Sequence, residues 1–168
     1  MSTTREQCQA AVIHFGNIIN QSDTTSGNCA YVGIAGDPLP KGEYSPLFPT
    51  FDIETIDADS KWGPDIICDI TKPNEDMLLR YDLVIIVQVI EHIKNLWDLP
   101  KALYQITKPH AHIIIDCPWN YPYHAEPPSF GDYWRITKDG FHALFEKQFN
   151  IIEVRSDSNN TSCLLQRK

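Results

Sequence analysis

The chain has 168 residues, of which 42% are hydrophobic, so it can bury one sizeable core and leaves little room for a second domain. Asp and Glu outnumber Lys and Arg by 22 to 14, and the net charge of −8 disfavours binding to nucleic-acid phosphates. No apolar run approaches the roughly 20 residues needed to cross a bilayer, and no secretory signal pattern opens the chain. We expect one domain over 1–168 in a soluble, cytoplasmic protein that binds neither nucleic acid nor membrane.

The five cysteines are odd in number and form no Cys-x-x-Cys pair. Several lie inside apolar, strand-like runs. We therefore expect reduced, buried thiols rather than disulfides or zinc ligands.

Helical and strand-like segments alternate along the chain. Residues 1–22 predict an amphipathic lead-in helix, because apolar residues recur at helical spacing between Ala11 and Ile19. Further helices are expected within 89–107, where Pro100 must either start a second helix or kink the first, and over 137–148, with Thr137 as N-cap. The predicted strands are 29–36, 50–59, 65–70, 81–88, 111–119, 149–156 and 161–168. Continuous Val/Ile runs indicate strands covered on both faces, so the order predicts a doubly wound α/β sheet.

Polar side chains stand where several predicted strands end, and ligands of such sheets bind beyond the carboxyl ends of the strands. Asp57, followed by Ala58 and Asp59, could accept bonds from both hydroxyls of a ribose. Asp69 could accept from an adenine amine while the backbone N–H of Ile70 faces a ring nitrogen. Each aspartate could instead be a helix N-cap or a turn former.

The turn "GIAGDP" after the first predicted strand could allow close backbone approach to a ligand, although two glycines often mark only a tight turn. Its residues that could contact a cofactor are Gly33, Ala35, Gly36 and Asp37.

Two segments resemble a known family, the small Rossmann-like S-adenosylmethionine-dependent methyltransferases, in particular the type 11 branch. They are "YDLVIIVQVIEHIKNLWDLPKALYQITKPHAHIIIDCPW" and "GDYWRITKDGFHALFE". The resemblance covers about 29–154 and is most specific over 81–146. It implies a mostly parallel, seven-stranded Rossmann-like sheet with an antiparallel C-terminal strand, and S-adenosylmethionine as cofactor.

The roles of the family's residues can be carried over position by position. By the resemblance, Asp57 is the ribose-binding acid, and Asp69 and Ile70 are the adenine-contacting pair. Gln88 is a residue near the methionine end of the cofactor. The first glycine motif departs from the family pattern, because Gly33 stands where an acid is expected and Ala35 near the first glycine. An inactive relative that retains the fold as a ligand-sensing or interaction module is therefore the alternative to an enzyme.

Glu91 and His92 match the Glu-His pair of the family's next helix. Glu91 could equally be an acid favoured by the helix dipole, and His92 a satisfied interface histidine. We predict His92 and His124 as candidate catalytic residues. The ordinary pKa of a histidine suits the role of general base that we expect for His124.

The long loop 118–135 is the candidate substrate lid, since long loops in small domains are often functional. Its rings could surround an acceptor or lie near the cationic sulfonium. Trp134 could instead plug the core, and Arg135 could be an internal clamp to Asp132. The candidate substrate-binding residues are Trp119, Tyr123, Asp132, Tyr133 and Arg135.

No metal site is expected, because His110 and His112 flank the start of a strand, at its opposite end from the crevice that holds His124. The resemblance implies a methyltransferase, and we expect it to act on an oxygen or nitrogen of a small-molecule acceptor.

Overall fold

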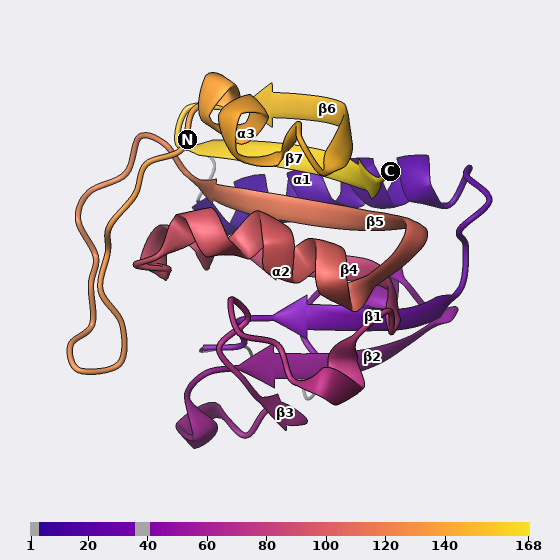
Figure 1. Ribbon diagram of the computed structural model, residues 1–168. Helices are drawn as coiled ribbons and strands as arrows, with labels where there is room; N and C mark the ends of the chain where they lie inside the picture. The colour runs from indigo at the N-terminus through magenta and orange to yellow at the C-terminus, as the bar shows by residue number, and fades with distance from the viewer. Residues whose placement is uncertain (1–3, 36–40) are drawn as a thin grey trace.

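A seven-stranded sheet forms the centre of the computed structural model, which describes residues 4–35 and 41–168 (Figure 1). The strand order is β3-β2-β1-β4-β5-β7-β6. Only β7 runs antiparallel to its neighbours, and the other pairs are parallel. The strands are β1 (Gly27–Val32), β2 (Phe51–Asp57), β3 (Ile66–Ile67), β4 (Tyr81–Val87), β5 (Thr107–Pro118), β6 (Phe149–Ser156) and β7 (Asn160–Arg167). This topology confirms the predicted Rossmann-like fold.

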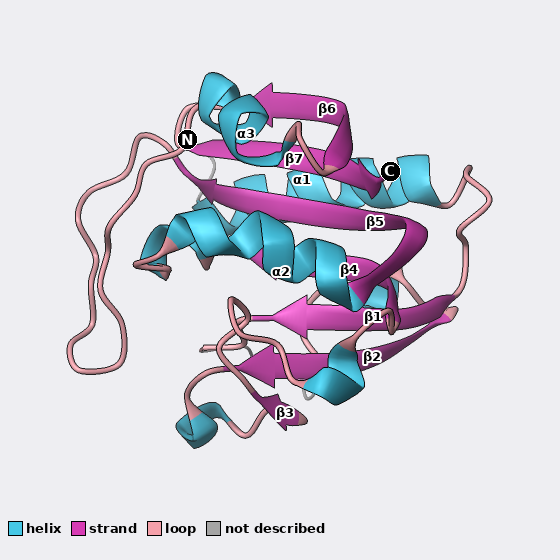
Figure 2. Cartoon of the chain, viewed as in Figure 1, coloured by secondary structure: helices cyan, strands magenta, loops and turns pink. Residues whose placement is uncertain are grey.

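Among the described residues, three α-helices cover the sheet on its two faces: α1 (Thr4–Ile19), α2 (Leu99–Ile106) and α3 (Lys138–Phe145). Figure 2 shows α2 and α3 in front of the sheet and α1 behind it. Each face has its own buried apolar cluster, one including Phe15 of α1 and the other Phe141 of α3. The helices thus make the doubly wound arrangement that the sequence predicts.

The central strands are buried because their side chains alternate between the two clusters. Leu83 and Ile85 of β4 belong to the cluster under α1, whereas Val84 and Ile86 belong to the cluster under α2 and α3. Full burial of such a side chain contributes about 1.5–3 kcal/mol. A run that is apolar at every position therefore suits a strand covered on both faces.

The predicted N-cap of the last helix and the predicted free thiols are confirmed. Thr137 caps α3, because its side chain accepts a hydrogen bond from the backbone N–H of Gly140. All five cysteines are buried free thiols. Within the described ranges, no helix combines the length and apolar character of a membrane span.

Two local predictions are wrong. The strand predicted at 65–70 shrinks to Ile66–Ile67, because the Asp65 carboxylate takes the backbone N–H and hydroxyl of Thr55 where a strand ladder would otherwise continue. The helical pattern predicted over 89–98 is replaced by two single 3₁₀ turns at Ile90–His92 and Leu96–Asp98, whereas the predicted alternative that Pro100 starts a helix is confirmed by α2, which begins at Leu99. Pro100 lies in the first turn of α2, where its missing N–H costs nothing.

Candidate functional site

A crevice of about 1050 Å³ opens at the carboxyl ends of the parallel strands. Its walls include the ends of β1, β2 and β4 and part of the loop between β5 and α3. Figure 1 shows this loop (orange) extending past the rim to which β1, β2 and β5 point. Asp57, Asp69 and Gln88 all line the crevice, so the three predicted strand ends do converge on one cavity. Its size suits a nucleoside-sized ligand.

Asp57 is held in place across the ends of β1 and β2. Its Oδ2 accepts a hydrogen bond from the backbone N–H of Ile34 at 3.0 Å, and its Oδ1 accepts from that of Asp59 at 2.9 Å. A carboxylate has about four acceptor positions, so each oxygen retains one for a ligand. A fixed carboxylate in a crevice wall fits the vicinal hydroxyls of a ribose.

The turn after β1 brings the backbone close to the crevice at Gly33. This residue has φ +79°, and a Cβ there would overlap Cγ2 of Val89. Only glycine therefore fits both the conformation and the space. Gly33 and Ala35 line the crevice, whereas Gly36 and Asp37 lie outside the described residues.

The other predicted nucleoside contacts also line the crevice, and two of them also accept hydrogen bonds within the turns in which they lie. Asp69 accepts from the N–H and hydroxyl of Thr71, at 3.0 and 2.7 Å. Asp59 caps the 3₁₀ turn Ser60–Trp62 through the N–H of Lys61. These bonds match the alternative interpretation of both aspartates as turn formers. Ala58 and Ile70 are further lining residues.

Gln88 closes β4 with φ +56° and is tied to a buried acid behind the crevice. Its side-chain amide donates to Oδ1 of Asp116 at 2.9 Å, and its backbone N–H donates to the Asp116 carbonyl at 2.8 Å. Burial raises the pKa of Asp116 to about 6, although hydrogen bonds from Ser162, Cys8 and Gln88 oppose the rise. The desolvation of Gln88 is thus offset inside the protein.

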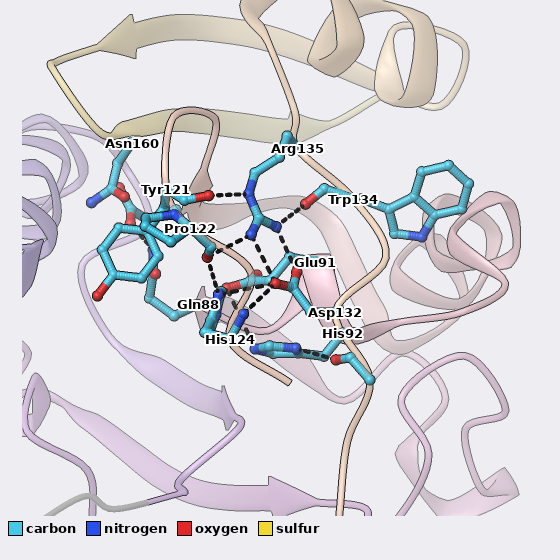
Figure 3. Close-up of polar contacts among 12 residues, drawn as sticks. Gln88, Glu91, His92, Tyr121, Pro122, His124, Asp132, Trp134, Arg135 and Asn160 are labelled. Atoms are coloured by element: carbon cyan, nitrogen blue, oxygen red, sulfur yellow. Dashed lines mark hydrogen bonds and ion pairs between the residues drawn. The ribbon is translucent and has the colours of Figure 1, made fainter. Parts of the chain in front are cut away.

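The base of the loop between β5 and α3 is fastened by Arg135. Its guanidinium bonds both oxygens of Asp132 at 2.5 and 2.8 Å and donates to the carbonyls of Tyr121, Pro122 and Trp134 (Figure 3). Arg135 holds the pKa of Asp132 well below its usual range, helped by the backbone N–H of His124. This is the internal clamp that was the alternative to substrate binding.

The predicted aromatic residues divide between the crevice and the outer surface. Tyr133 lines the crevice, as does Tyr121. Trp119 donates from Nε1 to the Asp157 carbonyl in the turn between β6 and β7, and Tyr123 is 75% exposed. Trp119, Tyr123, Asp132 and Arg135 all fall outside the described lining of the crevice.

Some aromatic lining residues were missed by sequence reasoning. Tyr31 and Tyr44 belong to the apolar cluster under α1, and Trp62 lies in the 3₁₀ turn Ser60–Trp62. Phe130, by contrast, lies in loop 118–135, the predicted lid. The alternation of β1 could have placed Tyr31, but no sequence signal directs Tyr44 or Trp62 to the crevice.

Glu91, His92 and His124 meet at one wall of the crevice (Figure 3). The two imidazole rings are 4.9 Å apart and nearly perpendicular. The backbone carbonyl of Glu91 accepts from the N–H groups of Tyr133 and Trp134, so the loop is bound to the turn that carries Glu91 and His92. The two predicted catalytic histidines are therefore neighbours in space, although His92 and His124 are 32 positions apart in the sequence, with α2 and β5 between them.

The carboxylate of Glu91, 3.8 Å from Nε2 of His124, is the main cause that raises the pKa of this histidine. Partial burial opposes the rise, while the Pro122 carbonyl and the Asp132 carboxylate add to it. His124 can therefore take up a proton at the crevice wall.

No protein-family model and no curated protein sequence matches the chain. Solved structures do match. A putative S-adenosylmethionine-dependent methyltransferase from Listeria monocytogenes aligns with a TM-score of 0.68 at 11% identity, over 95% of this chain and 99% of that one. The N-methyltransferase NodS from Bradyrhizobium japonicum, in complex with S-adenosylhomocysteine, gives 0.64 at 11% identity over 97% and 86%.

A third match is the 1,6-didemethyltoxoflavin-N1-methyltransferase of Burkholderia thailandensis, with its substrate and S-adenosylhomocysteine bound. It aligns with a TM-score of 0.63 at 10% identity, over 95% of this chain and 79% of that one. These structural neighbours are S-adenosylmethionine-dependent methyltransferases with a Rossmann-like fold. At such identities the likeness establishes the fold that this chain shares with them.

Proposed function

We propose that the protein transfers a methyl group from S-adenosylmethionine to an oxygen or nitrogen of a small-molecule acceptor. One observation carries the proposal: Asp57, Asp69 and Gln88 line a single crevice at the carboxyl rim of a sheet whose structural neighbours are methyltransferases. The neighbours with bound S-adenosylhomocysteine support the choice of cofactor.

The crevice residues fit the cofactor in a definite arrangement. Asp57 would bind the ribose hydroxyls with its two remaining acceptor positions, and Gly33 would let the backbone approach the ligand. Asp69 and Ile70 would contact the adenine, and Gln88 would lie near the methionine end. The bound cofactor supplies a methyl group that its sulfonium already activates.

The protein's own contribution is alignment, exclusion of water and removal of a proton. Alignment of two reactants can supply about 7–11 kcal/mol of the barrier. The loop between β5 and α3 covers the crevice, and its Ser129 bonds Lys61 beyond the end of β2. His124 is the candidate base for a protonated acceptor, because its Nδ1 faces the Pro122 carbonyl and Nε2 remains to receive the proton.

Calorimetric titration with S-adenosylhomocysteine tests the proposal, because the product binds without turnover. We expect binding by the wild type and a loss of about 1–3 kcal/mol in Asp57→Ala, the range for a hydrogen bond to a charged group. Asp52→Ala, which alters an exposed residue on the same strand, should bind like the wild type. Absence of binding at millimolar ligand would refute the cofactor assignment, and binding without any methyl transfer would favour a ligand-sensing relative.

A further inference from the structure

Three side chains that can each bind a metal ion meet at the crevice wall: those of Glu91, His92 and His124. Oε1 of Glu91 lies 3.6 Å from Nε2 of His92 and 3.8 Å from Nε2 of His124, and one ligand atom from each residue lies within 4.8 Å of the other two. Ligand atoms of a tetrahedral zinc site are about 3.4 Å apart, since the bonds measure about 2.0–2.2 Å. A modest inward movement of the two rings would bring all three atoms onto one ion.

Hydrogen bonds on the far side of each ring fix which nitrogen faces the cluster. Nδ1 of His92 lies 2.5 Å from the Gly131 carbonyl, and Nδ1 of His124 lies 3.2 Å from the Pro122 carbonyl. A carbonyl only accepts, so Nδ1 carries the proton in both rings. In its neutral form each ring then directs the lone pair of Nε2 toward Glu91. A bond from the second ring nitrogen to a carbonyl is also the usual support of a metal-binding histidine.

The carboxylate of Glu91 is fully buried, and neither of its oxygens has a hydrogen-bond partner among the described residues. A buried carboxylate without partners is costly. The nearby guanidinium of Arg135 is engaged by Asp132, so these two charges offset each other. One negative charge and three facing acceptor atoms therefore remain at the cluster.

We propose that Glu91, His92 and His124 bind a divalent transition-metal ion of the Zn²⁺ type, with its remaining coordination position open to the crevice. Two imidazole nitrogens and one carboxylate oxygen are a donor set that such ions accept. His92 and His124 line the crevice while Glu91 lies behind them, so the open position faces the ligand space.

The catalytic role of the ion rests on the proposed methyl transfer. The binding of the ion does not depend on that proposal. A metal-bound acceptor hydroxyl would lose its proton to solvent water more readily, and the resulting oxygen would be a better nucleophile for the methyl group of the sulfonium, which leaves as the neutral thioether. Nε2 of His124 cannot hold the ion and accept a proton at the same time. The metal would thus replace His124 as the means of activating the acceptor.

Titration of the full chain, free of any histidine tag and stripped with chelator, tests the site. Calorimetry with Zn²⁺ and visible absorption with Co²⁺ should give one equivalent bound for the wild type. Glu91→Gln, His92→Ala and His124→Ala should each weaken binding by about tenfold or more, by comparison with the 10–100-fold effect of losing even an outer-shell partner. His142→Ala, at an exposed histidine on α3, should bind like the wild type.

Lack of Zn²⁺ binding by the folded wild type at millimolar metal would overturn the proposal and leave a protonated His124 paired with Glu91. Binding that survives all three substitutions would overturn it too, since the ion would then lie elsewhere. Circular dichroism identifies variants that fail to fold. If Glu91→Gln is one of them, the two histidine variants still test the metal site. Titration with S-adenosylhomocysteine separates the two proposals, because either ligand can bind without the other.

Discussion

Gly33→Ala is the substitution whose effect the structure defines most sharply. An alanine there would adopt φ +79°, which costs about 1–2 kcal/mol in the left-handed region. Its Cβ would also overlap Cγ2 of Val89, and overpacking of this kind costs about 1–3 kcal/mol more. We expect the free energy of unfolding to fall by the sum of both terms, about 2–5 kcal/mol.

Gly63→Ala is the matched control, because Gly63 has φ +66° and no described atom lies within 4 Å of a Cβ placed there. It should lose only the conformational term of about 1–2 kcal/mol. Val89→Ala removes the colliding methyl group, so the double variant Gly33→Ala/Val89→Ala should recover the overpacking term. A double-mutant cycle then isolates the clash.

Urea unfolding followed by circular dichroism measures the stability of the wild type and of the four variants. Equal losses for Gly33→Ala and Gly63→Ala would refute the argument that β1 and the turn after β4 are in close contact. A cycle without coupling between Gly33 and Val89 would refute it as well.

Three further predictions concern the crevice and its loop. Asp116→Asn should remove a pH dependence, because the raised pKa of Asp116 stabilises the fold fully below pH 3.8 and this contribution is lost as the pH passes about 6. From pH 4 to 7 the wild type should therefore lose about 2 kcal/mol relative to the variant, and parallel urea-derived stability curves would refute this. Arg135→Lys should speed proteolysis of loop 118–135, because lysine cannot make the two-pronged bond to Asp132; cleavage no faster than in Arg155→Lys would contradict the clamp. His124→Ala should abolish methyl transfer while S-adenosylhomocysteine affinity stays within about twofold, and full turnover would remove His124 from the reaction.

The strands were predictable because burial on both faces leaves a continuous apolar run, as in β4 and β5. The absence of a helix directly after β4 was not predictable, because it results from tertiary contacts. The Glu91 carbonyl, which a helix would bond to a later N–H of its own, accepts instead from Tyr133 and Trp134. Local sequence around Glu91 carries no sign of that competition.

The site was predictable to the extent that topology defines it. The carboxyl ends of parallel strands share one edge, and that rule alone brought Asp57, Asp69 and Gln88 together. The internal partners of these residues were not predictable, since Asp116 binds Gln88 from β5 across the sheet. The cluster of Glu91, His92 and His124 depends on how loop 118–135 folds back, which no periodicity encodes.

The most direct test of the central claim is a crystal structure of the protein with S-adenosylhomocysteine. We expect the ribose hydroxyls to lie within hydrogen-bond distance of the Asp57 carboxylate, with the adenine beside Asp69 and Ile70 and the sulfur toward Gln88. A nucleoside bound elsewhere, or a crevice that stays empty at saturating ligand, would contradict it.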